Sequence, residues 1–80
     1  MVNIKDIFKK FSGKEVHSVF DNGKTYLASV TNKGDSIDEA LDCMYSVDKN
    51  TGKIEIFSVA ERATEFRDAL KKPLYLKKKK

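Results

Sequence analysis

Two short links that contain glycine limit this chain to a small set of folds. Asn22-Gly23 separates two runs rich in β-branched and aromatic residues, and the tetrapeptide KNTG at 49–52 separates two more. Such links are typical of β-hairpins, because tight hairpin turns need residues that tolerate a positive φ. The sequence therefore predicts two hairpins and a four-stranded antiparallel sheet.

The first hairpin is expected to turn at Asn22-Gly23 as a two-residue loop, with Asp21 opposite Lys24. This register places Val19 opposite Tyr26 and His17 opposite Ala28. Apolar residues then lie on both faces: Val19, Tyr26, Ala28 and Val30 on one, and Val16, Phe20 and Leu27 on the other. Since neither face is plainly polar, either both sides of the ribbon are covered or one side meets a partner.

The second hairpin is expected to pair Asp48 with Lys53. Val47 then lies opposite Ile54, and Tyr45 opposite Ile56. All four apolar side chains share one face, with Ser46 and Glu55 on the other. This agreement between the alternation and the position of the turn favours the register.

The loop at 48–52 invites comparison with a calcium-binding loop. Asp48 and Asn50 fit the first two ligand positions of an EF-hand, but Gly52 stands where a third ligand is needed, and Val59 where a carboxylate is needed. A turn accounts for the same residues, with Asp48 accepting backbone N–H groups ahead of it and Gly52 in the left-handed conformation. We therefore interpret the loop as a turn.

A helix is expected on each side of the two hairpins. Near the N-terminus, Asn3 can cap a helix and Gly13 can end it, and its apolar stripe consists of Ile4, Ile7, Phe8 and Phe11. After the second hairpin, residues 58–61 (SVAE) match a capping box. The apolar side of this second helix consists of Ala63, Phe66, Ala69 and Leu70.

Three segments lie outside the expected hairpins and helices: 32–42, 73–76 and 77–80. Pro73 is expected to end the second helix, and Leu74 or Tyr75 of the segment 73–76 is expected to pack on the sheet. Residues 32–42 are a loop with one helical turn. The expected fold is thus α+β, helix–hairpin–hairpin–helix, as a single domain over 1–76 with the helices packed on the sheet, followed by a disordered lysine tail at 77–80.

The net charge of +4 is concentrated in that tail. Of the 16 lysines and arginines, four are Lys77, Lys78, Lys79 and Lys80, and the remaining 12 match the 12 acidic residues of the chain. A nucleic-acid-binding face on the body would need basic residues without this matching acidity. The tail itself can contact a polyanion in a salt-sensitive way.

The lone thiol, Cys43, cannot form an internal disulfide, so nothing requires an oxidising compartment. The N-terminus has no uninterrupted apolar run of the kind a signal peptide contains, and no stretch is long enough to span a membrane. We expect a cytoplasmic protein with no membrane association.

Residues that carry enzyme chemistry are few. His17 is the only histidine, and a His17–Cys43 pair is the one nucleophilic arrangement the sequence leaves open. Asp35, Asp38, Glu39 and Asp42 have the spacing of a solvated acidic turn. The four glycines form no phosphate-binding loop. We expect no enzyme, no cofactor and no metal site.

A stretch of the second half resembles a known kind of protein. It comprises YSVDKNTGKI at 45–54, followed by Phe57-Ser58, Phe66, Ala69 and PLY at 73–75. This pattern, over 43–76, is similar to that of small bacterial and prophage α+β proteins, some of them immunity-like partners of toxins. The same hairpin motif also occurs in unrelated domains, such as PepSY-type domains. The resemblance implies a binding protein without chemistry and carries no family site residues.

The function expected from these observations is that of a small interaction protein, either an inhibitor or immunity-like partner or an accessory protein of a phage or mobile element. The candidate surface for a protein partner comprises Val19, Tyr26, Val30 and Tyr75. The alternative is a nucleic-acid-binding accessory protein that uses Lys77, Lys78, Lys79 and Lys80.

Overall fold

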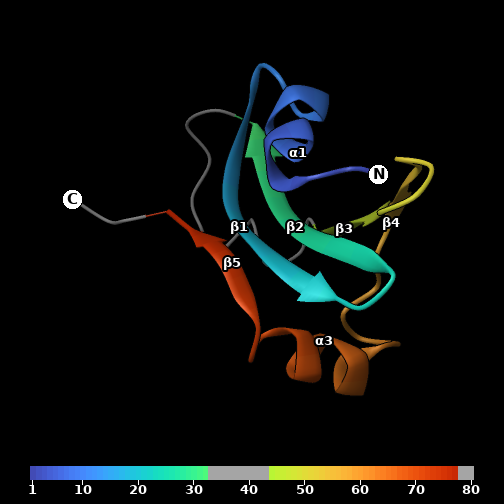
Figure 1. Ribbon diagram of the computed structural model, residues 1–80. Coiled ribbons are helices and arrows are strands. Elements are labelled where there is room, and N and C mark those ends of the chain that lie inside the picture. The colour runs from blue at the N-terminus through green and yellow to red at the C-terminus, as the bar shows by residue number, and fades with distance from the viewer. Residues whose placement is uncertain (33–43, 78–80) are drawn as a thin grey trace.

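The computed structural model describes residues 1–32 and 44–77, which form a five-stranded antiparallel sheet with two helices (Figure 1). The strand order across the sheet is β4-β3-β2-β1-β5. The elements in chain order are α1 (Ile4–Lys10), β1 (Lys14–Asn22), β2 (Thr25–Asn32), β3 (Met44–Asp48), β4 (Ile54–Ile56), α3 (Ala63–Ala69) and β5 (Pro73–Leu76). The predicted α+β class and antiparallel sheet are confirmed, and the predicted number of four strands is wrong.

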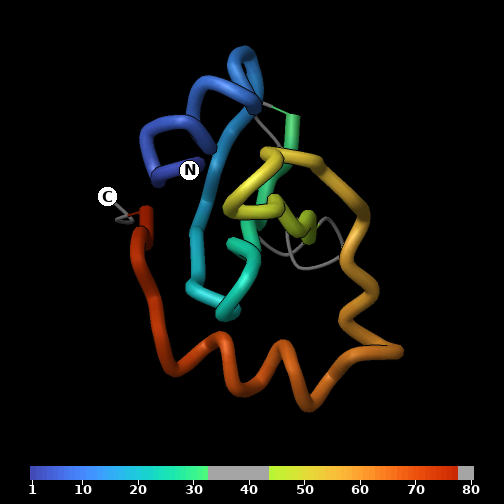
Figure 2. The backbone as a smooth tube through the Cα atoms, turned by 45° about the vertical axis from the view of Figure 1, so that its right-hand side comes forward, coloured from blue at the N-terminus to red at the C-terminus, as the bar shows by residue number. Residues whose placement is uncertain are grey.

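The additional strand is β5. Its first residue is Pro73, a position that proline tolerates in an edge strand because no ladder donor is needed there. β5 pairs with β1, with Tyr75 opposite Val19 and Leu76 opposite Ser18. The segment from β4 through α3 runs round one end of the sheet and delivers β5 to the opposite edge (Figure 2).

The first hairpin turns one residue later than predicted. Asn22 pairs with Thr25, so the two-residue loop is Gly23-Lys24, and Val19 lies opposite Ala28. Gly23 has φ of 75° and takes the first central position, as a type II′ turn requires. Asn22 remains in β1, where its side-chain amide donates to Thr25 Oγ1 at 3.3 Å. The turn therefore uses only the glycine of the Asn-Gly pair for its positive φ.

A bulge in β1 changes which residues face the core. The register shifts between Val16 and Ser18, so His17 has no directly opposed residue in β2. Val16 pairs with Val30 and joins the face that carries Val19. The predictions that His17 lies opposite Ala28 and that Val16 shares a face with Phe20 are therefore wrong.

Both faces of the central hairpin are covered, which was one of the two alternatives left open by the sequence. On one face, Ile7 of α1 and its C-cap residue Phe11 pack into a core cluster with Val16, Val19, Ala28, Val30 and Val47. On the other face, Ala69 of α3 packs with Phe20, Leu27, Met44 and Phe57. The sheet is thus the middle layer between two separate apolar clusters.

The first helix begins as predicted. Asn3 Oδ1 accepts the Asp6 backbone N–H at 3.1 Å, and Asp6 Oδ2 accepts the Asn3 backbone N–H at 3.0 Å. This reciprocal pair satisfies two of the N–H groups that a helix start leaves without partners. Gly13, with φ of 86°, reverses the chain into β1.

The second helix begins later than predicted. Ser58 Oγ accepts the Glu61 N–H at 3.4 Å and the Ser58 carbonyl accepts the Arg62 N–H at 3.0 Å, forming a turn before α3 starts at Ala63. Of its predicted apolar side, Ala69 is buried and Phe66 is half-buried, whereas Ala63 and Leu70 are exposed. The helix is short and covers one end of the sheet, so only part of its stripe reaches the core.

The second hairpin has the predicted register, with Val47 opposite Ile54 and Tyr45 opposite Ile56. The predicted loop at 32–42 lies, apart from Asn32 in β2, outside the described residues.

Leu27 tests the cluster on the α3 side. It is fully buried, and Leu27→Ala removes apolar contacts and leaves a cavity, so we expect a loss of about 3 kcal/mol in the free energy of unfolding. Urea denaturation followed by circular dichroism measures it. The matched control is Leu74→Ala, at an exposed position, which should cost under about 0.7 kcal/mol. Equal losses for the two variants would contradict the assignment of Leu27 to the core.

Candidate functional site

Two residues of the predicted interaction surface are not on the surface. Val19 is 0% exposed and Val30 is 2% exposed, because α1 covers the face that carries them. Neither side chain is accessible to a partner of the folded protein, which corrects that part of the expectation. Tyr26 and Tyr75 are half-buried at the margin of the same cluster.

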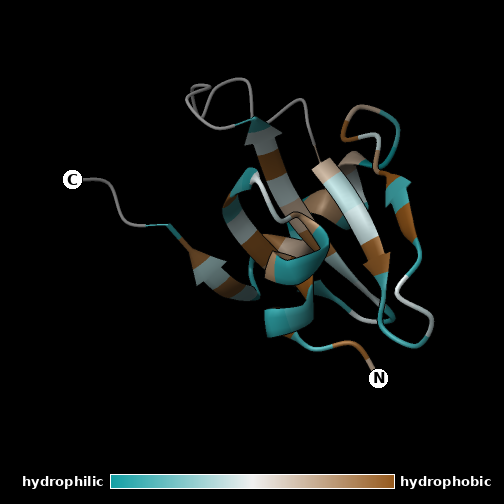
Figure 3. Ribbon diagram, turned by 90° about the horizontal axis from the view of Figure 1, so that it is seen from above, coloured by the Kyte–Doolittle hydropathy of each residue, from teal (hydrophilic) through white to brown (hydrophobic). Residues whose placement is uncertain are grey.

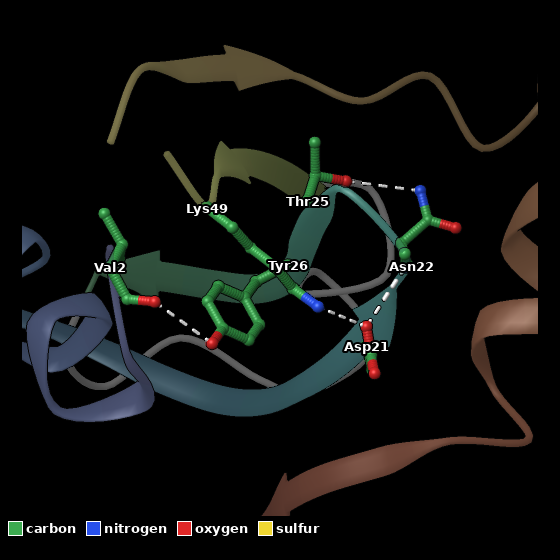
Figure 4. A network of polar contacts seen from close by, with 7 residues as sticks. Val2, Asp21, Asn22, Thr25, Tyr26 and Lys49 are labelled. Carbon is green, nitrogen blue, oxygen red and sulfur yellow. Dashed lines mark hydrogen bonds and ion pairs between the residues drawn. The ribbon is translucent and has the colours of Figure 1, made fainter. Parts of the chain in front are cut away.

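Tyr26 belongs to a polar network that connects three separate segments (Figure 4). Its hydroxyl donates to the Val2 carbonyl at 3.2 Å. Lys49 Nζ lies 4.9 Å from the centre of the Tyr26 ring and forms an ion pair with Asp21 Oδ1 at 2.7 Å. The Val2 backbone N–H in turn donates to the Lys49 carbonyl at 2.6 Å. The network around Tyr26 therefore connects the N-terminal segment with the turns that follow β1 and β3.

The same network lowers the pKa of Asp21. The main cause is the hydrogen bond from Lys49, followed by the backbone N–H of Gly23, which Asp21 Oδ1 accepts at 3.0 Å. Both donors favour the charged carboxylate. Asp21 thus acts as a structural anion that stabilises the first turn.

The loop after β3 is the predicted turn. Asp48 Oδ1 accepts the backbone N–H groups of Asn50 and Thr51 at 2.8 and 2.9 Å, and these two bonds lower the pKa of Asp48. Gly52 has φ of 78° and donates its N–H to the Asp48 carbonyl at 2.8 Å. The side chain of Asp48 is therefore occupied by the turn itself.

The only histidine lies in the bulge of β1. His17 is buried, and its Nε2 lies 2.7 Å from Thr31 Oγ1 in β2. Cys43 and the acidic residues Asp35, Asp38, Glu39 and Asp42 lie outside the described residues, so the predicted alternatives that involve them are not placed. Within residues 1–32 and 44–77, no three His, Cys, Asp or Glu side chains gather as a metal site would require.

The first residue of the predicted lysine tail is part of the ordered fold. The Lys77 backbone N–H donates to the His17 carbonyl at 2.9 Å, and its ammonium group forms an ion pair with Glu15. The prediction of a disordered tail is therefore wrong for Lys77. Lys78, Lys79 and Lys80 lie outside the described residues.

Within residues 1–32 and 44–77, strand β5 forms one edge of the sheet and exposes apolar side chains. Leu74 is 47% exposed and Leu76 is 58% exposed. Leu76 lies on the face opposite Tyr75, since side chains alternate along a strand, whereas Leu74 is the extra residue of a bulge, because Tyr75 pairs with Val19 and Pro73 with Phe20. Tyr75 packs edge-on against Phe8 of α1, with ring centres 4.9 Å apart. This contact anchors β5 and leaves its two leucines exposed.

Among the described residues, strand β4 forms the other edge of the sheet. Ile54 is 39% exposed and Ile56 is 83% exposed, on the face that carries Val47. Lys53 and Glu55 project from the opposite face and form an ion pair of 3.2 Å. Figure 3 shows brown, apolar residues on both outer strands. These four exposed aliphatic residues were not predicted as surface, because the sequence does not reveal which strands lie at the edges.

Comparison with protein-family models, with curated proteins and with solved structures finds no match to this chain. In the described part of the chain, no helix has the length and apolar character needed to cross a membrane.

The lowered pKa of Asp48 predicts a pH-dependent contribution to stability. Because the folded-state pKa lies below the ordinary value of 3.8, the stabilisation is complete above that value and is lost as the pH falls through the folded pKa. Asp48→Asn keeps an acceptor oxygen and removes the charge. We expect the variant to unfold at lower urea than the wild type near pH 7, and the gap to close below 3.8. A gap of constant size at all pH values would contradict this.

The Lys49–Asp21 ion pair predicts a titration shift. Lys49→Met removes the main donor that lowers the pKa of Asp21, so this pKa should rise towards 3.8. Carboxyl chemical shifts of Asp21, followed by NMR during an acid titration, measure the change. Lys53→Met, which removes a lysine paired with Glu55 instead, is the matched control and should leave Asp21 unchanged. An unchanged pKa of Asp21 in Lys49→Met would contradict the assignment of Lys49 as the main cause of the lowered pKa.

Proposed function

We propose that this chain is a small non-catalytic protein-interaction module that binds an extended segment of a partner protein along β5. The observation that carries the proposal is an anchored edge strand with Leu74 and Leu76 exposed at alternate positions. Inhibitory or immunity-like proteins and accessory proteins of mobile elements fall within this class.

The backbone of β5 favours addition of a strand. The Lys77 N–H donates inward to the His17 carbonyl, so the alternation of an antiparallel ladder turns the N–H and C=O of Leu76 toward the open side. An added strand gains affinity from these main-chain groups and specificity from the side chains at alternate positions. Leu76 would contact the side chain opposite it in the added segment, and Leu74 would add apolar contact at the bulge, where the regular pairing of β5 is interrupted.

The charge around β5 favours an acidic partner segment. Between residues 67 and 80 the sequence contains seven basic residues and only one acidic residue, Asp68. Lys72 and Lys77 directly flank the strand and are exposed. A segment with apolar side chains between acidic ones would complement this edge and would associate faster at low salt.

The described polar groups support a binding role over a catalytic one. His17 is hydrogen-bonded to Thr31 inside the sheet, and the Asp21 and Asp48 carboxylates stabilise turns. Each of these groups has a structural partner that accounts for its position.

The alternative, a nucleic-acid-binding accessory protein, is favoured by the run of four lysines at 77–80. A gel shift with single- and double-stranded nucleic acid at rising salt, with and without residues 78–80, separates the two functions. Binding that disappears with the three lysines and is unaffected at Leu74 would favour the alternative.

The proposed partner site is tested by photo-crosslinking in extracts of the cells that contain the protein. A photoreactive residue at position 76 should capture one discrete protein, whereas the same residue at Thr64, exposed on α3, should not. Leu74→Asp should reduce the adduct at least about tenfold, because it removes an apolar anchor and introduces a charge that repels an acidic segment.

The control for folding is the thermal unfolding of Leu74→Asp, which should stay within a few degrees of the wild type because the side chain is half-exposed. Equal adducts at positions 76 and 64, or an adduct that Leu74→Asp does not change, would refute the proposed site.

A further inference from the structure

Strand β4, at the opposite edge from β5, has side chains and backbone groups suited to a strand of its own sequence. It presents Ile54 and Ile56 on one face and Lys53 and Glu55, one position to either side of Ile54, on the other. A strand that complements β4 must match this short pattern of apolar and charged residues.

The backbone groups of β4 that have no partner among the described strands belong to its isoleucines. On the β3 side, the Lys53 carbonyl accepts from Asp48 at 2.9 Å and the Phe57 N–H donates to Met44 at 3.0 Å. Because inward and outward groups alternate along an antiparallel ladder, Glu55 also turns toward β3, and Ile54 and Ile56 turn their N–H and C=O outward. The backbone groups of β4 that an added strand can reach are therefore those of Ile54 and Ile56.

We propose that a second copy of this chain pairs with β4 in antiparallel orientation, about a two-fold axis at Ile54. In this register Ile54 lies opposite the partner's Ile54 and the two residues exchange their outward hydrogen bonds. Lys53 then lies opposite the partner's Glu55, and Glu55 opposite the partner's Lys53. Two ion pairs thus form across the interface from residues that already attract each other within one strand.

The other symmetric registers are less favourable. An axis at Glu55 places Glu55 opposite the partner's Glu55, which is repulsive. An axis at Ile56 places Glu55 opposite the partner's Phe57, which carries no charge to pair with it. Charge complementarity therefore selects the axis at Ile54.

The apolar face gains from the same arrangement. Ile56, the most exposed of the β4 side chains, lies diagonally across from the partner's Ile54 on one face of the joined sheet. The strand has only three residues, so the interface is well below the area of standard complexes. We expect a weak dimer, with a dissociation constant on the order of 0.1 mM.

This inference does not depend on the proposed partner at β5, because the two strands lie at opposite edges of the sheet. Either surface can be wrong without affecting the other.

Charge reversal at β4 tests the pairing by sedimentation equilibrium at protein concentrations up to the millimolar range. Lys53→Glu makes the edge acidic and Glu55→Lys makes it basic. Each variant alone should self-associate about tenfold more weakly, because two attractive pairs become repulsive. An equimolar mixture of the two should dimerise within about threefold of the wild type, since complementary pairs form again between unlike chains.

The matched controls are Lys5→Glu and Glu61→Lys, which make the same charge changes at exposed positions of α1 and of the turn before α3. These variants should dimerise like the wild type. A second test places cysteine at position 54 or at position 55 in a Cys43→Ser background. Position 54 should form the intermolecular disulfide on mild oxidation, because only this residue faces itself across the axis.

A wild type that remains monomeric at millimolar concentration would overturn the proposal. So would a mixture that associates no better than its components, or a disulfide that forms faster at position 55 than at position 54.

Discussion

The fold depends on a hairpin that is apolar on both faces. Strands β1 and β2 make the largest pairing in the sheet, and their buried side chains point in both directions, with Val19 and Ala28 on one side and Phe20 and Leu27 on the other. Such a ribbon is unstable in water until both faces are covered, because exposed apolar surface costs about 25 cal/mol per Å². The chain meets this requirement with one short helix from each end. Each helix has seven residues, too few to be stable alone, so the helices depend on the sheet as much as the sheet depends on them.

The turns and the N-terminal segment are joined by polar contacts at one corner of the molecule. Lys49, from the loop after β3, contacts Asp21 of the first turn, the ring of Tyr26 and the backbone of Val2. Much of this network is partly exposed, so each contact contributes little on its own. The main contribution of the network is positional, since it fixes α1 relative to β2 and β3. An N-terminal segment positioned in this way allows a seven-residue helix to cover the centre of the sheet.

Local patterns in the sequence predicted the elements well and their arrangement less well. The helix cap at Asn3 and the alternation on either side of Asp48 and Gly52 involve neighbours within a few residues, so the sequence carries the whole signal. The bulge at His17 could not be predicted, because the alternation of β1 alone does not reveal an extra residue. The extra residue becomes evident only when the pairing of β1 with β2 is known. The first turn was misplaced by one residue because Asn22-Gly23 and Gly23-Lys24 both satisfy the need for a positive φ, in different turn types.

The candidate site was harder to predict for the same reason. Whether Ile54, Ile56, Leu74 and Leu76 are buried depends on strand order, which is a property of the whole sheet. The alternation of Ile54 and Ile56 indicated correctly that they belong to a strand and incorrectly suggested core positions for them, whereas residues 73–76 were not predicted to be a strand. Val19 and Val30 were proposed as surface because one face of the hairpin was free to meet a partner, and α1 occupies that face instead.

The position of β5 has a consequence for how the protein is made. Four strands follow one another as neighbours from β1 to β4, but the strand that covers the outer side of β1 comes from the last part of the chain. During synthesis on the ribosome, the first strand to emerge must keep one side unpaired until residue 76 has left the exit tunnel. Throughout that interval this nascent edge is open to pairing with other chains, which makes the arrival of β5 the step that covers β1.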